Sequence, residues 1–453
     1  MILPESFTKY TAQLMGDDLY NRFVDGLQSP PPVSVRMNRS KCGDDTPFEG
    51  EGIAWCDCGY YLSERPAFTF DPLLHAGYYY VQEASSMFVH HALRQYINCP
   101  VRMLDMCAAP GGKSTAALGA LPEGSTLMSN EPIRLRAQIL AENLQKWGNP
   151  NVIVTNNYPK DYARSGLTFD VILCDVPCSG EGMFRKDEGA ISEWSVQNVE
   201  NCRNLQREIV SEAWKCLNED GLLIYSTCTF NAKENEENVA WICEELGAEV
   251  LPIDIEKEWG INGSLVKDLD MPVYRFIPGC TRGEGLFMAV LRPTQTPLAE
   301  RNRGGKRSKA KPLKLGIDAR KYLAEPDNFS IHTHDNDIIA IAKAMAEQYE
   351  TAADRLRIVH AGIKMGTVKG KDFIPDQSLA ISTALDRSAF ATAELDYEQA
   401  IKYLQRDAVV LPNDTPRGFV LLTYKGAPLG FVKNIGNRTN NMYPQEWRIR
   451  SMR

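Results

Sequence analysis

The sequence predicts an α/β protein whose central part is a doubly wound, mostly parallel sheet. Residues from about 100 to 295 alternate between short apolar runs and helical segments, as strand–helix–strand units do. Several of the apolar runs end in an acidic, amide or cysteine side chain. Because ligands of open α/β sheets bind beyond the carboxyl ends of the strands, we expect the functional site at these strand ends.

Length, net charge and cysteine content limit the kinds of protein that this chain could be. A chain of 453 residues is too long for a single core, so several domains are expected. The net charge of −8 argues against a protein that coats nucleic acid without specificity, but it is compatible with a nucleic-acid enzyme that has local basic patches. The sequence shows no secretion signal and no apolar run near the ~18 residues of a membrane helix. The 12 cysteines are scattered, and several lie inside apolar runs, so reduced thiols and a cytoplasmic location are expected.

The first 95 residues begin with a helical pattern over 7–27. A strand of alternating apolar and polar residues is expected over 33–41. Its polar positions include Arg36, Asn38, Arg39 and Lys41. These side chains suit either a solvated strand face or contacts with phosphates. A second helix is expected over 87–96.

Six apolar runs are the expected strands of the central sheet, and they lie at 101–106, 126–129, 151–155, 169–175, 221–228 and 286–291. Two of the segments between them, 133–147 and 202–217, have clear helical spacing. This alternation is the basis for expecting a mostly parallel sheet with helices on both faces.

Beyond residue 295 the composition changes. Between Arg301 and Lys314 the chain carries 7 basic residues and no acidic one. Such a run is typical of a solvated linker, and it equally suits electrostatic attraction to phosphates. A smaller α+β region follows, with a helix expected at 337–348 and a hairpin of strands at 418–424 and 428–433.

The C-terminal tail combines arginines with aromatic side chains. Arg438, Arg448 and Arg450 lie near Tyr443 and Trp447. Interleaved basic and aromatic residues suit RNA contacts, although an ordinary solvated face fits the same pattern.

The first strand of the central sheet leads into a glycine-rich turn that opens a helix. Its residues are Cys107, Ala108, Ala109, Pro110, Gly111, Gly112 and Lys113. Such a turn lets the backbone approach a ligand closely. Nucleoside triphosphate binding is not expected, because the phosphate-loop pattern requires a glycine at position 107 and because Pro110 removes an amide that would face the phosphates.

Side chains at the ends of the second, third and fourth strands indicate the chemistry of the ligand. Glu131 follows the second strand, where a carboxylate commonly holds ribose hydroxyls. Asn156 and Asn157 follow the third strand and suit an adenine edge, and Asp175 ends the fourth. A dehydrogenase fits the ribose-binding acid, but its GxGxxG fingerprint is missing. A ligand with adenine, ribose and a cationic amino-acid end meets all these groups, and S-adenosylmethionine is such a ligand.

Two cysteines are expected at neighbouring strand ends. Cys178 lies just after Asp175, and Cys228 ends the fifth strand. A thiolate is a good nucleophile toward an electron-poor ring carbon. Its addition to C6 of cytosine makes C5 nucleophilic, an acid near N3 such as Asp175 would stabilise the adduct, and a second cysteine could assist its release. The structural alternative is a pair of core thiols.

Three motifs resemble those of the Nop/Sun family of RNA 5-cytosine methyltransferases. They are Cys-Ala-Ala-Pro-Gly-Gly-Lys at 107–113, Asp-Val-Pro-Cys-Ser-Gly at 175–180 with its continuation to 187, and Ser-Thr-Cys-Thr-Phe at 226–230. Residues 80–86 resemble the start of the family's catalytic domain. The resemblance covers about residues 75 to 295 and is looser on either side.

The resemblance implies a Rossmann-like S-adenosylmethionine-dependent methyltransferase sheet with an RNA-binding α+β module before it and a PUA-like α+β region after it. The expected parts are an RNA-binding module over 1–95, the catalytic domain over 96–295, a basic linker over 296–319, an α+β region over 320–395 and a PUA-like RNA-binding domain over 396–453.

The resemblance also assigns roles to single residues. Cys228 resembles the nucleophile that attacks C6, and Cys178 the cysteine that aids release of the methylated product. Asp175 resembles the residue that contacts both the methyl donor and cytosine. The 107–113 loop and Glu131 resemble the cofactor cradle. The family often has an aspartate where this chain has Asn156 and Asn157, so either amide, with Asn157 preferred, is expected to contact adenine.

The expected reaction is methylation of cytosine C5 in RNA, with 16S ribosomal RNA or the small ribosomal subunit as the substrate. A tRNA methyltransferase and a non-catalytic RNA-binding factor of ribosome assembly are the alternatives. A monomer is favoured. No metal is expected, because Cys42, Cys56 and Cys58 lack a CxxC pair or a nearby histidine in the sequence.

Overall fold

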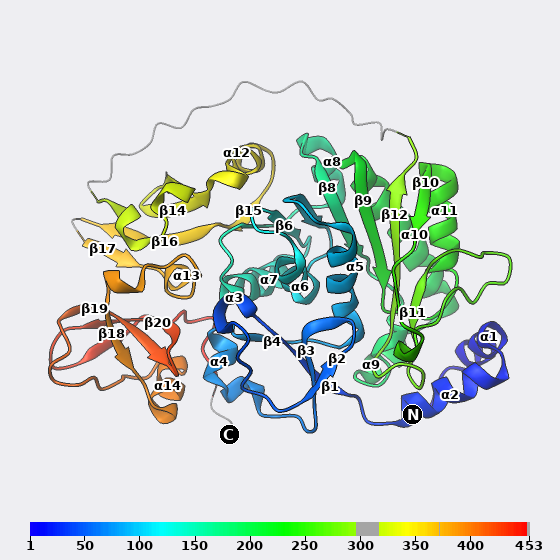
Figure 1. Cartoon of the computed structure of the whole chain (residues 1–453), viewed down its shortest axis with the longest axis horizontal. Coiled ribbons are helices and arrows are strands. Elements are labelled where there is room, and N and C mark those ends of the chain that lie inside the picture. The colour runs from blue at the N-terminus through cyan, green and yellow to red at the C-terminus, as the bar shows by residue number, and fades with distance from the viewer. Residues whose placement is uncertain (296–316, 371, 451–453) are drawn as a thin grey trace.

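A computed structural model describes residues 1–295, 317–370 and 372–450 of the chain (Figure 1). The described residues form four sheets. The N-terminal helices and the C-terminal sheets lie at opposite ends of the molecule, and the largest sheet lies between them (Figure 1). The basic run from Arg301 to Lys314, on which the linker prediction depends, lies outside the described residues.

The largest sheet has a parallel centre, and it confirms the predicted doubly wound fold. Its central strands are hydrogen-bonded in the order β9-β8-β5-β6-β7. Their bounds are β5 Arg102–Asp105, β6 Thr126–Asn130, β7 Val152–Thr155, β8 Phe169–Asp175 and β9 Leu217–Thr227. Each neighbouring pair among them is parallel. The carboxyl ends of these strands therefore meet at one edge of the sheet.

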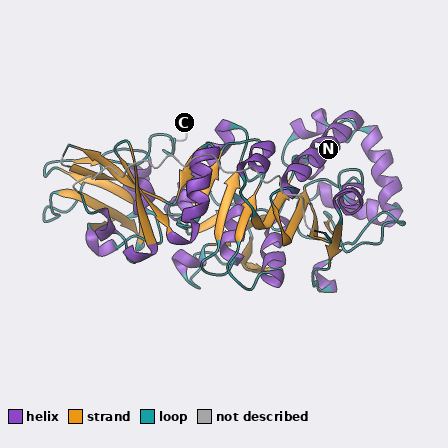
Figure 2. Cartoon of the chain, turned by 90° about the horizontal axis from the view of Figure 1, so that it is seen from above, coloured by secondary structure: helices purple, strands orange, loops and turns teal. Residues whose placement is uncertain are grey.

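Helices cover both faces of this sheet (Figure 2). They include α5 Phe88–Tyr96, α6 Gly112–Ala120, α7 Arg134–Trp147, α8 Pro159–Ser165, α10 Val196–Trp214 and α11 Glu236–Leu246. Leu104, Ile172 and Leu223, one on each of three neighbouring strands, are fully buried. Burial on both faces explains why these strands are apolar along their length rather than alternating.

Antiparallel strands complete the sheet at both margins. Beyond β9 lie β12 Leu286–Pro293, β10 Ala248–Leu251 and β11 Tyr274–Phe276. Beyond β7 lies β15, Ile358–Ala361, which pairs antiparallel with it. This last strand was not expected in the central sheet, since it comes from the region predicted to form the C-terminal α+β part. The boundaries of the domains stay a prediction.

The N-terminal part begins with two helices rather than the single one expected over 7–27. They are α1 Glu5–Met15 and α2 Asp17–Gln28. Gly16 separates them with a backbone φ of 72°, a conformation that glycine adopts readily. Phe7 and Phe23 from these helices pack on Phe184, Trp194 and Phe230, which belong to loops after β8 and β9.

A four-stranded sheet follows, in the order β2-β3-β1-β4. Its strands are β1 Val33–Met37, β2 Glu51–Ile53, β3 Cys56–Leu62 and β4 Tyr79–Val81, accompanied by the short helices α3 Arg39–Cys42 and α4 Pro72–His75. The expected strand over 33–41 therefore stops at Met37.

Both expectations for Arg36 were wrong, because its side chain is fully buried. Its guanidinium donates hydrogen bonds to Gln82 Oε1 at 2.8 Å and to Thr115 Oγ1 at 2.6 Å. It also lies 4.5 Å from the centroid of the Trp147 ring. Arg36 thus joins the N-terminal sheet to α6 and α7 instead of meeting solvent or phosphate.

The expected helix at 337–348 was also wrong. Residues Asp337–Ala342 form β14, and a helix, α12, runs only over Ala346–Arg355. β14 pairs with β13 (Phe329–His334) and β16 (Ile363–Lys369), and β17 (Asp372–Pro375) completes this sheet. Its isoleucines and alanines satisfy helical spacing over a short stretch, but pairing on both sides fixes the strand.

The last sheet is formed by β18 Ala391–Glu394, β19 Gly418–Tyr424, β20 Ala427–Asn434 and β21 Thr439–Asn441, with α13 Gln377–Ala380 and α14 Tyr397–Leu404 packed nearby. The predicted hairpin at 418–433 is confirmed as β19 and β20. Tyr443 and Trp447 are buried rather than available to stack on RNA bases, so that interpretation of the tail was wrong for these two rings.

No helix within the described ranges combines the length and the apolar character needed to cross a membrane.

Candidate active site

Two thiols and a carboxylate meet where β8 and β9 end. The two strands are parallel neighbours, and Asp175 pairs in register with Ser226. The loops that follow carry Cys178 and Cys228, whose sulfur atoms lie 3.1 Å apart. Both cysteines are partly accessible rather than sealed in the core. The structure therefore brings together the three residues for which the sequence analysis expects catalytic roles.

The surroundings of Cys178 favour its protonated form. The hydrogen bond with Cys228 raises the pKa of the Cys178 thiol well above its ordinary value, and burial raises it further. These surroundings keep Cys178 a thiol beside the Cys228 sulfur.

Asp175 is held from two sides. Lys113 Nζ donates to Asp175 Oδ2 at 2.8 Å, and Ser226 Oγ donates to Oδ1 at 2.7 Å. The carboxylate is about one third exposed, whereas the Lys113 side chain is 12% exposed. Burial acts to lower the pKa of Lys113, but the charge of Asp175 and the hydrogen bond to it outweigh burial and raise the pKa. Lys113 thus stays a cation beside the acid.

The glycine-rich turn at 107–113 is tied to the sheet and to α7. The amide of Ala108 donates to the carbonyl of Asn130 at 2.8 Å. Arg136 and Asn143 donate to the carbonyls of Ala109 and Pro110, at 3.2 Å and 2.8 Å. Gly111 has a φ of 112°, which disfavours any side chain there, and α6 begins at the next residue.

Glu131 lies at the end of β6 and is almost fully buried. Its Oε1 accepts the amide of Ile133 at 2.8 Å, and its Oε2 lies 3.4 Å from Arg136. The carboxylate is thus fixed in orientation beside the glycine-rich turn, and its role toward a ribose stays a prediction.

The amides of Asn156 and Asn157 are engaged with the backbone. Asn156 Nδ2 donates to the carbonyls of Glu131 and Pro132, both at 2.8 Å. The Asn157 side chain donates to the carbonyl and accepts from the amide of Arg357. Neither amide is free in this arrangement, so the expected adenine contact of Asn157 stays a prediction.

Asp105 is a buried acid that the sequence analysis did not assign to the site. It ends β5, accepts a 2.6 Å hydrogen bond from Ser114 Oγ on Oδ2, and has no partner for Oδ1 among the described residues. Burial raises its pKa to about 7. An unpaired buried oxygen at a strand end, beside a glycine turn and a second acid, fits a ligand that carries hydroxyl and ammonium donors.

A second buried acid, Glu181, locks the two cysteine-bearing loops together. Its Oε2 accepts the amides of Phe230 and Asn231 at 2.7 Å and 3.0 Å, and its Oε1 accepts the indole N–H of Trp194 at 2.9 Å. The amide of Gly182 donates to the carbonyl of Cys228 at 2.7 Å. The loop after β8 therefore sets the position of Cys228 on the loop after β9.

Glu234 fixes the loop that carries Cys178 in a similar way, through hydrogen bonds from three other residues. Its carboxylate accepts the amide of Ser179 at 3.0 Å and the side-chain amides of Gln206 at 2.6 Å and Asn231 at 2.7 Å. Burial raises its pKa to about 7. Sequence reasoning missed both glutamates, because their importance lies in partners that are far apart along the chain.

Three family models match the chain. They describe a 16S rRNA methyltransferase RsmB/F over residues 99–292, an N-terminal domain of 16S rRNA methyltransferase RsmF over 3–84, and a methyltransferase RsmF PUA domain over 390–449.

Curated relatives match along the whole chain. The "Ribosomal RNA small subunit methyltransferase F" of Aliivibrio fischeri (strain MJ11) is 30% identical over 474 residues, which cover 98% of each protein. The protein of the same name from Escherichia coli O1:K1 / APEC is 30% identical over 478 residues, which cover 98% of this chain and 96% of the relative.

Solved structures share the fold. A methyltransferase homolog protein from Pyrococcus horikoshii has a TM-score of 0.53 and 24% identity, and the match covers 64% of this chain and all of that one. NSun6 from Pyrococcus horikoshii, solved with SFG, has a TM-score of 0.54 and 19% identity, with 64% and 98% coverage. At these identities the likeness supports the Rossmann-like methyltransferase fold alone.

Proposed function

This chain belongs to the ribosomal RNA small subunit methyltransferase F family of S-adenosylmethionine-dependent 16S rRNA methyltransferases, and from that premise we propose that it methylates C5 of a cytosine in 16S rRNA. The observation that carries the cytosine-C5 assignment is the pair of sulfur atoms 3.1 Å apart beside Asp175. Methylation of an amine or a ribose hydroxyl needs no thiol nucleophile, whereas C5 of cytosine is too weakly nucleophilic to accept a methyl group until a thiolate adds at C6.

The first step of the proposed reaction is addition of Cys228 to the base. The sulfur forms a bond to C6, and the electron pair of the C5=C6 bond becomes available at C5. Negative charge moves toward N3 and O2 of the ring, and Asp175 is proposed to hold N3 through a shared proton that neutralises this charge and returns to Asp175 on release. The Lys113 ammonium, 2.8 Å from Asp175, balances that charge.

S-adenosylmethionine supplies the methyl group that C5 takes up. In the proposed release step the C5 proton leaves to a water molecule, its electron pair restores the C5=C6 bond, and the C6–S bond breaks. The protonated thiol of Cys178 then hydrogen-bonds the departing sulfur of Cys228, which makes that sulfur a better leaving group. This role agrees with the position of Cys178 and with the raised pKa of its thiol.

We propose that the turn at 107–113, Glu131, Asp175 and one of the amides Asn156 and Asn157 hold the adenosyl and amino-acid parts of S-adenosylmethionine. Asp105 joins this set on the strength of its unpaired, buried Oδ1. A role for Asn157 at adenine requires its side chain to exchange the Arg357 backbone for the ligand.

The test is methylation with labelled S-adenosylmethionine of three substrates: small ribosomal subunits from a strain that lacks the gene, naked 16S rRNA and tRNA transcripts. Digestion to nucleosides and mass spectrometry then identifies the product. 5-Methylcytidine in 16S rRNA or in the subunit supports the proposal, and label in tRNA alone supports the alternative substrate. A product other than 5-methylcytidine contradicts the reaction, and no product with any RNA favours a binding factor.

A further inference from the structure

Two cysteines and a histidine that play no part in methyl transfer form a compact buried cluster. Cys56 and Cys58 are two positions apart on β3, so their side chains share one face of the strand. His90 comes from α5, which packs beside that strand. All three are buried, and their potential ligand atoms lie within 4.8 Å of one another.

The spacing of the two sulfurs matches a metal site. Cys56 Sγ and Cys58 Sγ are 3.7 Å apart. Two thiolates at zinc–sulfur distances of about 2.3 Å with a tetrahedral angle stand about 3.8 Å apart. The cluster therefore needs no rearrangement of the strand to place both sulfurs on one ion.

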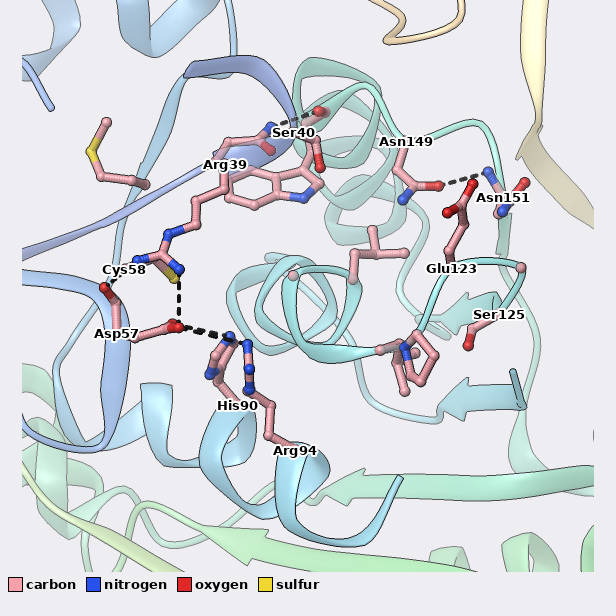
Figure 3. Close-up of a pocket in the computed structure, with 18 residues that line it drawn as sticks. Arg39, Ser40, Asp57, Cys58, His90, Arg94, Glu123, Ser125, Asn149 and Asn151 are labelled. Carbon is pink, nitrogen blue, oxygen red and sulfur yellow. Dashed lines mark hydrogen bonds and ion pairs between the residues drawn. The ribbon is translucent and has the colours of Figure 1, made fainter. Parts of the chain in front are cut away.

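A cavity of about 300 Å³ adjoins the cluster and is lined in part by Asp57, Cys58 and His90 (Figure 3). Asp57 Oδ1 lies 3.8 Å from His90 Nε2. The other carboxylate oxygen is held by Arg39 at 3.0 Å and by Arg94 at 3.6 Å. Asp57 points to the opposite face of β3 from the two cysteines, so its carboxylate lies outside the ligand set, and the cavity has room for water as the fourth ligand.

The charges around the cluster suit a divalent ion. The buried guanidinium of Arg36 interacts electrostatically with both cysteines. The Asp57 carboxylate is already paired with Arg39 and Arg94, and two thiolates balance the two positive charges of a divalent ion. The ring of His90 also hydrogen-bonds the backbone of Gly119, and such a bond commonly orients a metal-bound histidine.

We propose that Cys56, Cys58 and His90 bind a zinc ion, with a water molecule from the adjoining cavity as the fourth ligand. The ion clamps the N-terminal sheet to α5, the helix that leads into the first strand of the methyltransferase sheet. This site is independent of the proposed methyl transfer. It departs from the expectation of no metal, which was drawn from the sequence alone, where His90 is distant from the cysteines that the fold brings beside it.

The experiment uses the full-length chain without a metal-binding tag. Metal content is measured by mass spectrometry, and Co²⁺ is added to the metal-depleted protein to observe sulfur-to-cobalt absorption and tetrahedral ligand-field bands. We expect about one zinc per chain, both cobalt signals, and a fall in the Tm when a chelator is added. The paired variant C56S/C58S and the single variant His90→Asn should lose zinc and weaken both cobalt signals.

The matched control is the variant C178S/C228S, which removes the other close pair of thiols and should keep the zinc. If the C56S/C58S variant does not fold, the wild-type protein supplies a second measurement: Zn²⁺ should slow alkylation of Cys56 and Cys58 at least tenfold without protecting Cys99. The proposal would be overturned if the purified protein contains no zinc and added Zn²⁺ does not change the alkylation rate of Cys56 and Cys58. It would also be overturned if the C178S/C228S variant loses the zinc and the C56S/C58S variant keeps it.

Discussion

Cys178 and Cys228 have different proposed roles. The hydrogen bond between them and burial raise the pKa of the Cys178 thiol, which agrees with its proposed part in product release, and Cys228 is the proposed nucleophile. Sequence alone predicted that these two cysteines and Asp175 would lie together, because each follows a strand of a parallel sheet. It could not predict the roles of Asp105, Glu181 and Glu234, whose partners are distant in sequence.

Lys113 offers a test of the charge beside Asp175. Lys113→Met removes the ammonium that is 2.8 Å from the carboxylate while keeping a side chain of similar length. We expect kcat for methyl transfer to fall roughly 10²- to 10³-fold, because a fixed charge aimed at the reacting ring is lost. Steady-state kinetics with labelled S-adenosylmethionine measure the effect. Lys257→Met, at an exposed position, is the control and should leave kcat unchanged.

The buried carboxyl of Asp105 predicts a pH dependence of the free energy of unfolding. Its pKa is raised to about 7 in the folded protein, so between pH about 4 and 7 the folded state binds a proton that the unfolded state has released. This group therefore makes the free energy of unfolding fall as pH rises through that window, by on the order of 2–4 kcal/mol. Asp105→Asn should flatten this dependence.

Urea unfolding of the ligand-free protein at pH 5 and pH 8 measures the slope for Asp105→Asn. The exposed Asp268→Asn serves as its control and should keep the wild-type slope. An Asp105→Asn protein with the full wild-type dependence would show that Asp105 titrates normally.

At the scale of the elements, the loop after β8 contacts the loop after β9 closely and sets the distance between them. A Cβ on Gly182 would lie 2.4 Å from the carbonyl oxygen of Cys228, so Gly182→Ala must push the two loops apart. We expect roughly a 10- to 100-fold loss of kcat, since a displacement near 1 Å at a reacting group has that effect. Gly263→Ala is the control, because a Cβ there meets nothing within 4 Å. Equal activity of the two variants would show that this contact does not position Cys228.

The elements also show where sequence reasoning reaches its limit. The buried parallel strands were predictable, because their apolar runs are bounded by clear turns. The strand β14 was mistaken for a helix, since its five isoleucine and alanine residues satisfy both periods and only pairing with β13 and β16 decides between them. Arg36 looked solvent-facing by its chemistry, but Gln82, Thr115 and Trp147 give it partners from distant parts of the chain.

At the scale of the whole molecule, the C-terminal part completes the central sheet. β15 pairs with β7, and the amide of Gly362 donates to the carbonyl of Val152. A chain that ends at residue 295 leaves β7 as an exposed edge strand. We expect it to have a lower Tm and to aggregate on heating, as measured by calorimetry and light scattering.

A chain that ends at residue 389 keeps β15 and lacks the last sheet with α14, so it is the matched control. It should stay monodisperse at temperatures where the shorter chain aggregates. Equal stability of the two chains would mean that β15 contributes nothing to the sheet.

The central claim is that Cys228 forms the bond to cytosine and that Cys178 releases it. Its most direct test is to incubate wild-type protein, Cys228→Ala and Cys178→Ala with S-adenosylmethionine and the RNA substrate, and to separate the products on a denaturing gel. We predict methyl transfer by the wild type, no transfer and no adduct with Cys228→Ala, and a stable protein–RNA adduct that accumulates with Cys178→Ala. Methyl transfer by Cys228→Ala, or an adduct that requires Cys178 instead of Cys228, would contradict the claim.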